Sequence, residues 1–278
     1  MCRKLSKVVL VTGCSSGIGY YCAKELQKNG YRVFATARKS EDVKRLQAEG
    51  LESFQLDLDD SESIKSTVVE SLKRCDGKLY ALFNNGAFGQ PGAVEDLSRQ
   101  TLRKQFETNV FGTQELTNLV LLAMRENGEG RIIQNSSVLG FVSMKYRGAY
   151  NASKYALEGL SDTMRLELSD ENIFVSLIEP GPIRSDFRKN ALAKLLENID
   201  IKNSSHAKRY EKKLQGLESE ADIPFTLGSD AVFKDLLHAL ESKKPKARYR
   251  VTTPTKLFAF LKRVLSTNAL DYILKKVD

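Results

Sequence analysis

Short apolar segments rich in β-branched residues alternate with longer amphipathic segments along the first 180 residues of this chain. The apolar segments predict strands over residues 7–12, 32–36, 53–56, 80–83, 131–134 and 173–178. The segments between them predict helices over residues 17–29, 40–49, 61–74, 98–127 and 150–168, the second with Ser40 as its N-cap. Strands that alternate with helices form a parallel sheet covered on both faces. The sequence therefore predicts an α/β fold with a doubly wound parallel sheet.

No feature of the sequence marks a second domain. The chain has 278 residues, of which 41% are hydrophobic, and this is enough for one large core. It contains only 6 prolines and no linker rich in serine and glycine. We therefore expect residues 1–278 to form a single domain.

The sequence favours a cytoplasmic protein. Its apolar runs, such as Val8–Val11, are far too short to cross a bilayer, and its basic start lacks the long apolar core of a secretory signal. The 4 cysteines show neither CxxC pairs nor metal-ligand spacing. We expect free thiols in a reducing compartment and no bound metal.

The formal net charge of +8 is compatible with nucleic-acid binding. However, Lys and Arg are spread along the chain without interleaved aromatic residues, so we expect no nucleic-acid partner. A basic protein also attracts an anionic cofactor. Only two histidines are present, His206 and His238, which leaves little material for a histidine-based metal site or a serine triad.

Glycine and polar residues directly follow the predicted strands, at the carboxyl ends where ligands bind in sheets of this kind. In strand order these residues are Gly13, Arg38, Asp57, Asn85, Ser137 and Pro180. Because the carboxyl ends of parallel strands meet along one edge of the sheet, the six positions predict a shared binding site. Their convergence carries more weight than any single motif.

The segment after the first strand has the features of a phosphate-binding loop. Glycines without a Cβ let the backbone turn sharply and approach a pyrophosphate, and the helix that follows offers free N–H groups. The glycines have GxxxGxG spacing and lie between a strand and a helix, as a Rossmann-type dinucleotide site requires. The candidate cofactor-binding residues here are Gly13, Ser15, Ser16, Gly17, Ile18 and Gly19.

The same loop permits a different interpretation. Gly13-Cys14-Ser15-Ser16-Gly17 matches the GxSxG nucleophile elbow of serine hydrolases. That elbow needs an acid and a histidine later in the chain, and oxyanion donors from an earlier βα loop. No earlier βα loop exists here because the motif follows the first predicted strand. A serine hydrolase is therefore the less favoured alternative.

The end of the second strand bears on the choice of cofactor. An acidic residue there binds the ribose 2′-hydroxyl of NAD and repels the 2′-phosphate of NADP. In this chain the strand ends Ala35-Thr36-Ala37-Arg38-Lys39, and Arg38 is able to pair with a phosphate in bidentate geometry. We predict NADP as the cofactor; the alternative is that Arg38 is merely solvated.

Tyr150 and Lys154 are four residues apart and therefore share one face of a predicted helix. A tyrosine with its usual pKa near 10 is a poor base near neutral pH, but a neighbouring ammonium favours the phenolate. Ser137 follows the fifth strand and would hydrogen-bond the substrate oxygen with which Tyr150 exchanges a proton. A phenol, an ammonium and a hydroxyl beside a dinucleotide site predict hydride exchange with a carbonyl, with Tyr150 as general acid and base.

The glycine loop, the Tyr150–Lys154 pair and Ser137 thirteen positions before the tyrosine resemble the short-chain dehydrogenase/reductase family. Within it, the chain is most similar to the 17β-hydroxysteroid and retinol dehydrogenase branch and to bacterial NADP-dependent aldehyde reductases. The resemblance implies that Asn109 completes a catalytic tetrad, by bending its helix and holding a water that relays protons through Lys154. It also implies a homodimer or homotetramer formed by the helices that begin near Ser98 and Tyr150.

The resemblance covers about residues 5–190 and implies further cofactor contacts. Asp57 corresponds to an acid that contacts the adenine, although it also fits a turn or helix cap before Ser61. Beyond the glycine loop, the implied cofactor residues are Arg38, Asp57, Leu58, Asn85, Gly86, Tyr150, Lys154, Pro180, Ile183 and Ser185. The chain departs from the family in having Asn84-Asn85-Gly86-Ala87 where Asn-Asn-Ala-Gly is usual.

The favoured function is an NADP(H)-dependent oxidoreductase that interconverts a carbonyl and its alcohol; the alternative is a catalytically silent NADP-binding regulatory or scaffold protein. Residues 190–216 are placed to form a lid, and 255–278 form a C-terminal extension. In the extension the apolar residues that recur among Lys256, Lys262 and Arg263 are Leu257, Phe258, Phe260, Leu261, Val264 and Leu265. This stretch either walls the pocket or makes weak peripheral membrane contact. Both possibilities favour a lipophilic aldehyde, ketone or steroid-like alcohol as substrate.

Overall fold

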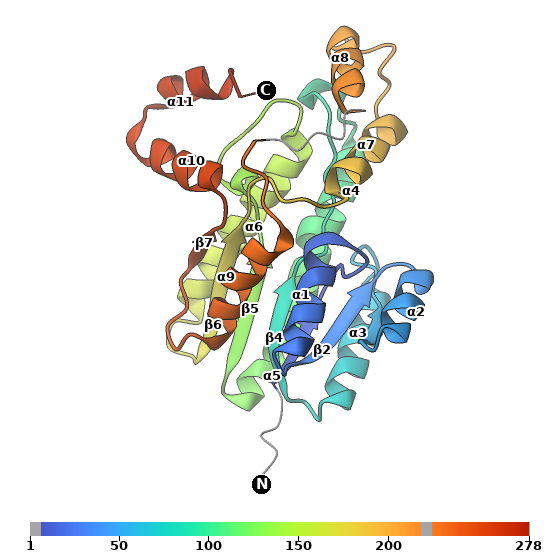
Figure 1. The fold of residues 1–278 in the computed structure, drawn as a ribbon, viewed down its shortest axis with the longest axis vertical. Helices are drawn as coiled ribbons and strands as arrows, with labels where there is room; N and C mark the ends of the chain where they lie inside the picture. Colours follow the sequence, from blue (N-terminus) through green and yellow to red (C-terminus); the bar gives the residue numbers. More distant parts are fainter. Residues whose placement is uncertain (1–6, 218–223, 278) are drawn as a thin grey trace.

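The molecule is built on a parallel sheet with the strand order β3-β2-β1-β4-β5-β6-β7 (Figure 1). This computed structural model describes residues 7–217 and 224–277. The strands are β1 (Val8–Val11), β2 (Arg32–Ala37), β3 (Glu52–Gln55), β4 (Leu79–Asn84), β5 (Gly130–Asn135), β6 (Ile173–Glu179) and β7 (Arg248–Arg250). The first six match the predicted strands within one or two residues, and β7 was not predicted. The α/β, Rossmann-type doubly wound fold is confirmed.

Helices cover both faces of the sheet, as predicted. They are α1 (Gly17–Lys28), α2 (Ser40–Ala48), α3 (Ser61–Arg74), α4 (Arg99–Phe106), α5 (Thr113–Asn127), α6 (Gly148–Glu167), α7 (Phe187–Asn198), α8 (Ala207–Leu217), α9 (Ser229–Glu241), α10 (Thr253–Val264) and α11 (Thr267–Leu274). Along β1, Val9 and Val11 pack against α1, α2 and α9, whereas Val8 and Leu10 pack against α3, α5 and α6. The alternation follows from the two-residue period of a strand, and it holds the sheet between two apolar cores.

The prediction of a single helix over residues 98–127 is wrong for the middle of this range. It is interrupted by a π-helical segment, η2 (Glu107–Gly112), between α4 and α5. A Cβ built on Gly112 would lie 1.8 Å from the Leu58 carbonyl oxygen, so this segment presses directly on the loop after β3. The widened turn contains Asn109, which agrees with the expectation that this residue bends its helix.

One predicted helix cap is also wrong. Ser40 is the first residue of α2, and Lys39 occupies the N-cap position without a side-chain capping bond. Ser98, by contrast, caps α4 by accepting a hydrogen bond from the backbone N–H of Thr101.

Two helical pairs lie beyond the strands at the same end of the molecule (Figure 1). The pair α7 and α8 contains most of the predicted lid, residues 190–216, and the pair α10 and α11 forms the predicted extension from residue 255 to residue 277. Movement of a lid stays a prediction. Within the described parts of the chain, no helix is long and apolar enough to cross a bilayer.

Candidate active site

The glycine loop lies between β1 and α1, with Gly13 and Gly17 at positive φ angles of 70° and 58°. A Cβ on Gly13 would lie 2.6 Å from Cα of Gly86, and one on Gly19 would lie 2.3 Å from the Gly13 carbonyl oxygen. Only glycine fits these two positions. Ser16 begins α1 without a side-chain cap, which leaves the N–H groups of the first turn available to an anion.

The loop after β4 is hydrogen-bonded to the glycine loop. Asn85 donates from Nδ2 to the carbonyl oxygens of Thr12 (3.0 Å) and Gly13 (3.1 Å), and its Oδ1 accepts from Nδ2 of Asn135 (2.9 Å). The N–H of Gly86 donates to Thr12 Oγ1 at 2.8 Å. The unusual Gly86-Ala87 order therefore places the residue without a Cβ directly against Gly13. Thr12 and Asn135 were not predicted as site residues: Thr12 stands at the start of the glycine motif but outside its phosphate-binding positions, and Asn135 belongs to no motif.

The ends of β2 and β3 supply the remaining predicted cofactor positions. Arg38 is exposed directly after the buried Ala37, with no acidic residue at the strand end. Asp57 accepts from the N–H of Asp59 at 3.1 Å, so its carboxylate shapes a turn, as the alternative interpretation expected. Leu58 is 7% exposed and packs in the core.

Arg45 of α2 braces the glycine loop, a role that the sequence did not reveal. Its Nη2 donates to the Ser15 carbonyl oxygen at 2.6 Å, and its guanidinium lies 5.4 Å from the ring of Tyr20. The contact joins two elements far apart in sequence, so no local pattern indicates it.

Tyr150, Ser137 and Lys154 meet at the carboxyl end of β5. Ser137 is the hydrogen-bonding neighbour of the Tyr150 phenol that lowers its pKa, and the Lys154 ammonium lies 5.7 Å from the Tyr150 ring centroid. Lys154 donates from Nζ to the Asn135 carbonyl oxygen at 2.7 Å. Burial raises the pKa of Tyr150 to about 12, partly opposed by the bond to Ser137, and burial lowers the pKa of Lys154 to about 8. At neutral pH the phenol is therefore protonated and the amine mostly charged.

Asn109 approaches this group through its neighbour on α6. Its Nδ2 donates to Ser153 Oγ (3.1 Å) and to the Phe88 carbonyl oxygen (3.0 Å), and its Oδ1 accepts from the Phe88 N–H (3.2 Å). Ser153 directly precedes Lys154. Asn109 thus ties the π-helical segment to the loop after β4 and to the part of α6 that carries Tyr150 and Lys154.

The segment after β6 closes the other side of the site. The Pro180 carbonyl oxygen accepts from the N–H of Val138, next to Ser137, at 2.8 Å. Ile183 forms a β-bridge with Leu227. Cβ of Ser185 lies 3.0 Å from the position that a Cβ on Gly17 would take, so this segment faces the glycine loop.

Apolar side chains enclose Tyr150. The Phe187 ring, at the start of α7, lies 5.3 Å from the Tyr150 ring. A Cβ on Gly89 would come within 2.8 Å of the Phe187 ring. A second apolar group joins the end of β5 to the C-terminal helices and to Tyr150; it comprises Val138, Leu139, Phe141, Val142, Met144, Phe258, Leu261, Ile273 and Leu274. The extension therefore walls the site.

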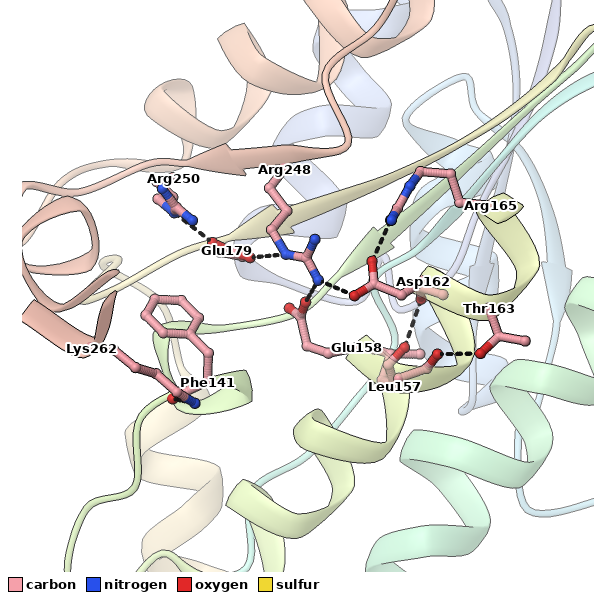
Figure 2. Close-up of polar contacts among 12 residues, drawn as sticks. Phe141, Leu157, Glu158, Asp162, Thr163, Arg165, Glu179, Arg248, Arg250 and Lys262 are labelled. Carbon is pink, nitrogen blue, oxygen red and sulfur yellow. Dashed lines mark hydrogen bonds and ion pairs between the residues drawn. The ribbon is translucent and has the colours of Figure 1, made fainter. Parts of the chain in front are cut away.

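An ion-pair network extends from α6, beyond Lys154, toward β7 (Figure 2). Glu158 lies one helical turn beyond Lys154 and is 7% exposed. Arg248 reaches Glu158 at 3.1 Å, Asp162 at 2.5 Å and Glu179 at 3.0 Å. The charge of Glu158 raises the pKa of Lys154, against the effect of burial. The network both anchors β7 and favours the ammonium form of Lys154.

Each of the two histidines pairs with side chains that lie outside the glycine loop. His206 contacts Tyr146 Oη through Nδ1 at 3.1 Å and Glu95 through Nε2 at 2.7 Å. His238 contacts Tyr249 Oη through Nδ1 at 2.8 Å. Cys14, the second residue of the GxSxG match, is buried, and burial raises the pKa of its thiol to about 12. This arrangement does not support the serine-hydrolase interpretation.

The family model described as short chain dehydrogenase matches residues 7–195 of the chain. The uncharacterized oxidoreductase YbbO of Escherichia coli K12 is 43% identical over 273 residues, which cover 98% of this chain and 96% of that protein. Human retinol dehydrogenase 8 is 36% identical over 199 residues, covering 68% of this chain and 63% of its own.

Solved structures agree with the fold. A short-chain dehydrogenase from Streptomyces avermitilis has a TM-score of 0.76 at 29% identity, covering 98% of this chain and 95% of its own. Two Burkholderia enzymes share the fold at 21% identity. The one from B. phymatum holds NAD (TM-score 0.76, 94% of each chain), and the one from B. cenocepacia holds NADP (TM-score 0.75, 97% of each chain).

Proposed function

The chain belongs to the short-chain dehydrogenase family, and we propose that this oxidoreductase uses NADP(H) to interconvert a lipophilic carbonyl compound and its alcohol. The observation that carries the proposal is the meeting of Tyr150, Ser137 and Lys154 beside the glycine loop. A bound nicotinamide would supply or accept the hydride. The chain itself has to bind the cofactor, hold the substrate oxygen and move one proton.

The proton chemistry is assigned to the phenol. A protonated Tyr150, hydrogen-bonded to Ser137, is the form needed to donate a proton to a carbonyl oxygen during reduction. Lys154 stabilises the phenolate that remains, since an ammonium favours a nearby anion. In alcohol oxidation the same phenolate removes the hydroxyl proton. Asn109 positions the turn of α6 that carries Lys154, through its bond to Ser153.

NADP is favoured over NAD by the end of β2. The lack of a Cβ at Gly13 and Gly19 leaves a cradle for a pyrophosphate, which suits either cofactor. Arg38, exposed after the uncharged Ala37, is placed to pair with a 2′-phosphate. The remaining contacts proposed for the cofactor are those predicted from the sequence, from Ser15 to Ser185, with Asp57 contributing through the turn that it shapes.

The apolar walls support a lipophilic substrate. Phe187 covers Tyr150 on one side, and the cluster containing Leu261 and Ile273 covers it on another. The name of one relative, retinol dehydrogenase 8, points in the same direction. A reducing cytoplasmic compartment is proposed from the free thiols of the three described cysteines.

A homodimer or homotetramer through η2, α5 and α6 is proposed from three exposed apolar side chains. Phe111 is 54% exposed, Leu122 60% and Leu160 40%. Large exposed apolar side chains that gather on one face are typical of protein interfaces. Sedimentation velocity of the wild type and of a Leu122→Ser, Leu160→Ser variant would test this. A monomeric wild type would contradict it.

The variant Tyr150→Phe tests the catalytic proposal. It removes the proton donor but leaves the ring, so turnover of NADPH with aldehydes and ketones should fall by about 10²–10⁴-fold, with NADPH affinity nearly unchanged. The matched control is Tyr155→Phe, on the same helix and 39% exposed, which should retain activity. Substantial activity in Tyr150→Phe would overturn the mechanism. A wild type that binds NADPH but reduces none of the compounds would favour the silent scaffold.

A further inference from the structure

The helix α10 has two apolar faces, and only one of them packs against the protein. Its inner face places Phe258 and Leu261 in the cluster that walls the active site. On the side that faces away from this cluster, Leu257 is 52% exposed, Phe260 61% and Val264 55%. At about 100° per residue, these three positions share one side of a helix. Walling the site therefore does not explain them.

Two basic side chains border the exposed apolar positions along one edge of the helix. Lys256 precedes Phe260 by one helical turn and Arg263 follows it by nearly one turn, and both are exposed. We call these five residues the outer face of α10: Lys256, Leu257, Phe260, Arg263 and Val264. Lys262, on the inner side, is held against the body through its bond to the Phe141 carbonyl oxygen. The outer face thus combines apolar side chains with positive charge.

The rest of the C-terminal segment has the same character. Residues 253–277 contain five Lys or Arg and one acidic residue, Asp271. On α11, Tyr272 is 64% exposed while Ile273 and Leu274 turn inward to the active-site cluster. Figure 1 places α10 and α11 at one side of the molecule, beyond β7 and opposite α2 and α3.

We propose that the outer face of α10 docks the protein on the surface of an anionic lipid bilayer. A helix with an apolar strip bordered by Lys and Arg lies in the plane of a membrane, with its apolar side chains among the acyl chains and its cations near the lipid phosphates. The positive charge selects this occupant, because a second copy of the chain would bring like charges together at the same surface. The inner face of the same helix walls the site, so docking brings the site next to the phase in which a lipophilic substrate dissolves.

Co-sedimentation of the full-length protein with vesicles tests the docking without any need for catalysis. Vesicles of phosphatidylcholine and phosphatidylglycerol at 3:1 should bind the protein, and vesicles of phosphatidylcholine alone should bind it far less. Removing one basic residue should weaken binding about fivefold, so Lys256→Gln with Arg263→Gln should weaken it about 25-fold. The matched control is Lys44→Gln with Lys73→Gln, two exposed lysines on α2 and α3, which should leave binding unchanged.

A second pair of variants tests the apolar contribution. Val264→Ser should weaken binding severalfold, while Val69→Ser, which changes a valine 66% exposed on α3, should not. The chain contains no Trp, so Phe260→Trp introduces a single fluorophore into the outer face. Its emission should shift to shorter wavelength with anionic vesicles, and the emission of Val69→Trp should not. Activity toward a short water-soluble aldehyde should be the same in Val264→Ser as in the wild type.

Two outcomes would overturn the proposal. One is a wild type that fails to bind anionic vesicles at low ionic strength. The other concerns a Phe260→Ser variant that binds vesicles like the wild type. If the wild type self-associates in sedimentation velocity without lipid and this variant does not, the outer face is a contact between copies. Since none of these measurements depends on turnover, failure of the docking proposal and failure of the proposed function are distinguishable.

Discussion

Replacing Arg248 with methionine should destabilise the protein strongly, because the guanidinium neutralises carboxylates that have almost no access to water. It pairs with Glu158 and Glu179, whose side chains are 9% and 1% exposed, and with the more exposed Asp162 (Figure 2). Removing one partner of a buried ion pair typically costs about 3–5 kcal/mol. Arg250 still reaches Glu179 at 3.3 Å in the variant, so we expect a loss near the lower end, about 3 kcal/mol.

The loss should depend on pH. Burial, and secondarily the charge of Glu158, raise the pKa of Glu179 to about 7 in the folded protein, against 4.5 for an unperturbed glutamate. A raised carboxyl pKa means that the folded state is most favoured below the unfolded pKa and loses stability as pH rises toward 7, by about 3 kcal/mol in all. Without Arg248 this pKa rises further, so the variant keeps losing stability above pH 7. The difference between variant and wild type should therefore be larger at pH 8.5 than at pH 5.5.

Urea denaturation at these two pH values measures the effect. The matched control is Arg125→Met, which breaks the exposed pair with Glu171, whose side chains are 48% and 34% exposed, and should cost at most about 1 kcal/mol at either pH. If Arg248→Met costs no more than this control, or costs more at pH 5.5 than at pH 8.5, the buried carboxylates are not what Arg248 stabilises.

Two further predictions concern specificity. The double variant Ala37→Asp, Arg38→Leu should shift the ratio of kcat/KM toward NADH, because the new carboxylate repels a 2′-phosphate and its cationic partner is gone; a wild type that already prefers NADH would refute the assignment of Arg38. In a series of straight-chain aldehydes, kcat/KM should rise with length by up to about 0.8 kcal/mol per buried methylene, and Leu261→Ala with Ile273→Ala, or removal of residues 255–278, should flatten the trend. A flat series in the wild type would show that these helices do not build an apolar pocket.

Most of the strands that the sequence predicted are buried along their length, β3 at the edge of the sheet being the exception. β1 and β4 are short apolar runs that end just before a glycine or asparagine turn, and such a pattern is typical of a buried strand. β7 is different, since its sequence is Arg-Tyr-Arg and only Tyr249 is buried. It joins the sheet beside β6, and both of its arginines pair with Glu179. Partners so distant along the chain leave no local signal.

The sequence did not predict the π-helical segment or the contacts around the site, because these also depend on partners distant along the chain. The stretch from residue 98 to 127 has no glycine or proline before Gly112, so its local pattern predicts one helix. The interruption depends on Asn109 bonding the backbone of Phe88 and on Gly112 pressing on Leu58, contacts between different loops. The motif residues were found because each follows a strand, whereas Arg45 and Asn135 act through bonds to backbone atoms, which any sequence offers.

The two sides of the site differ in how firmly they are built, and this difference bears on what can change without loss of the chemistry. On the cofactor side, Gly13 and Gly19 leave no space for a Cβ, and Asn85 bonds three strand ends together. On the substrate side, α11 has no fully buried residue in its described length and reaches the site through Ile273 and Leu274 alone. Substitutions on the first side displace several backbone segments at once, so they should abolish cofactor binding and turnover together. Substitutions on α11 alter only the shape of the apolar wall, so they should redistribute kcat/KM among substrates while NADPH affinity stays constant.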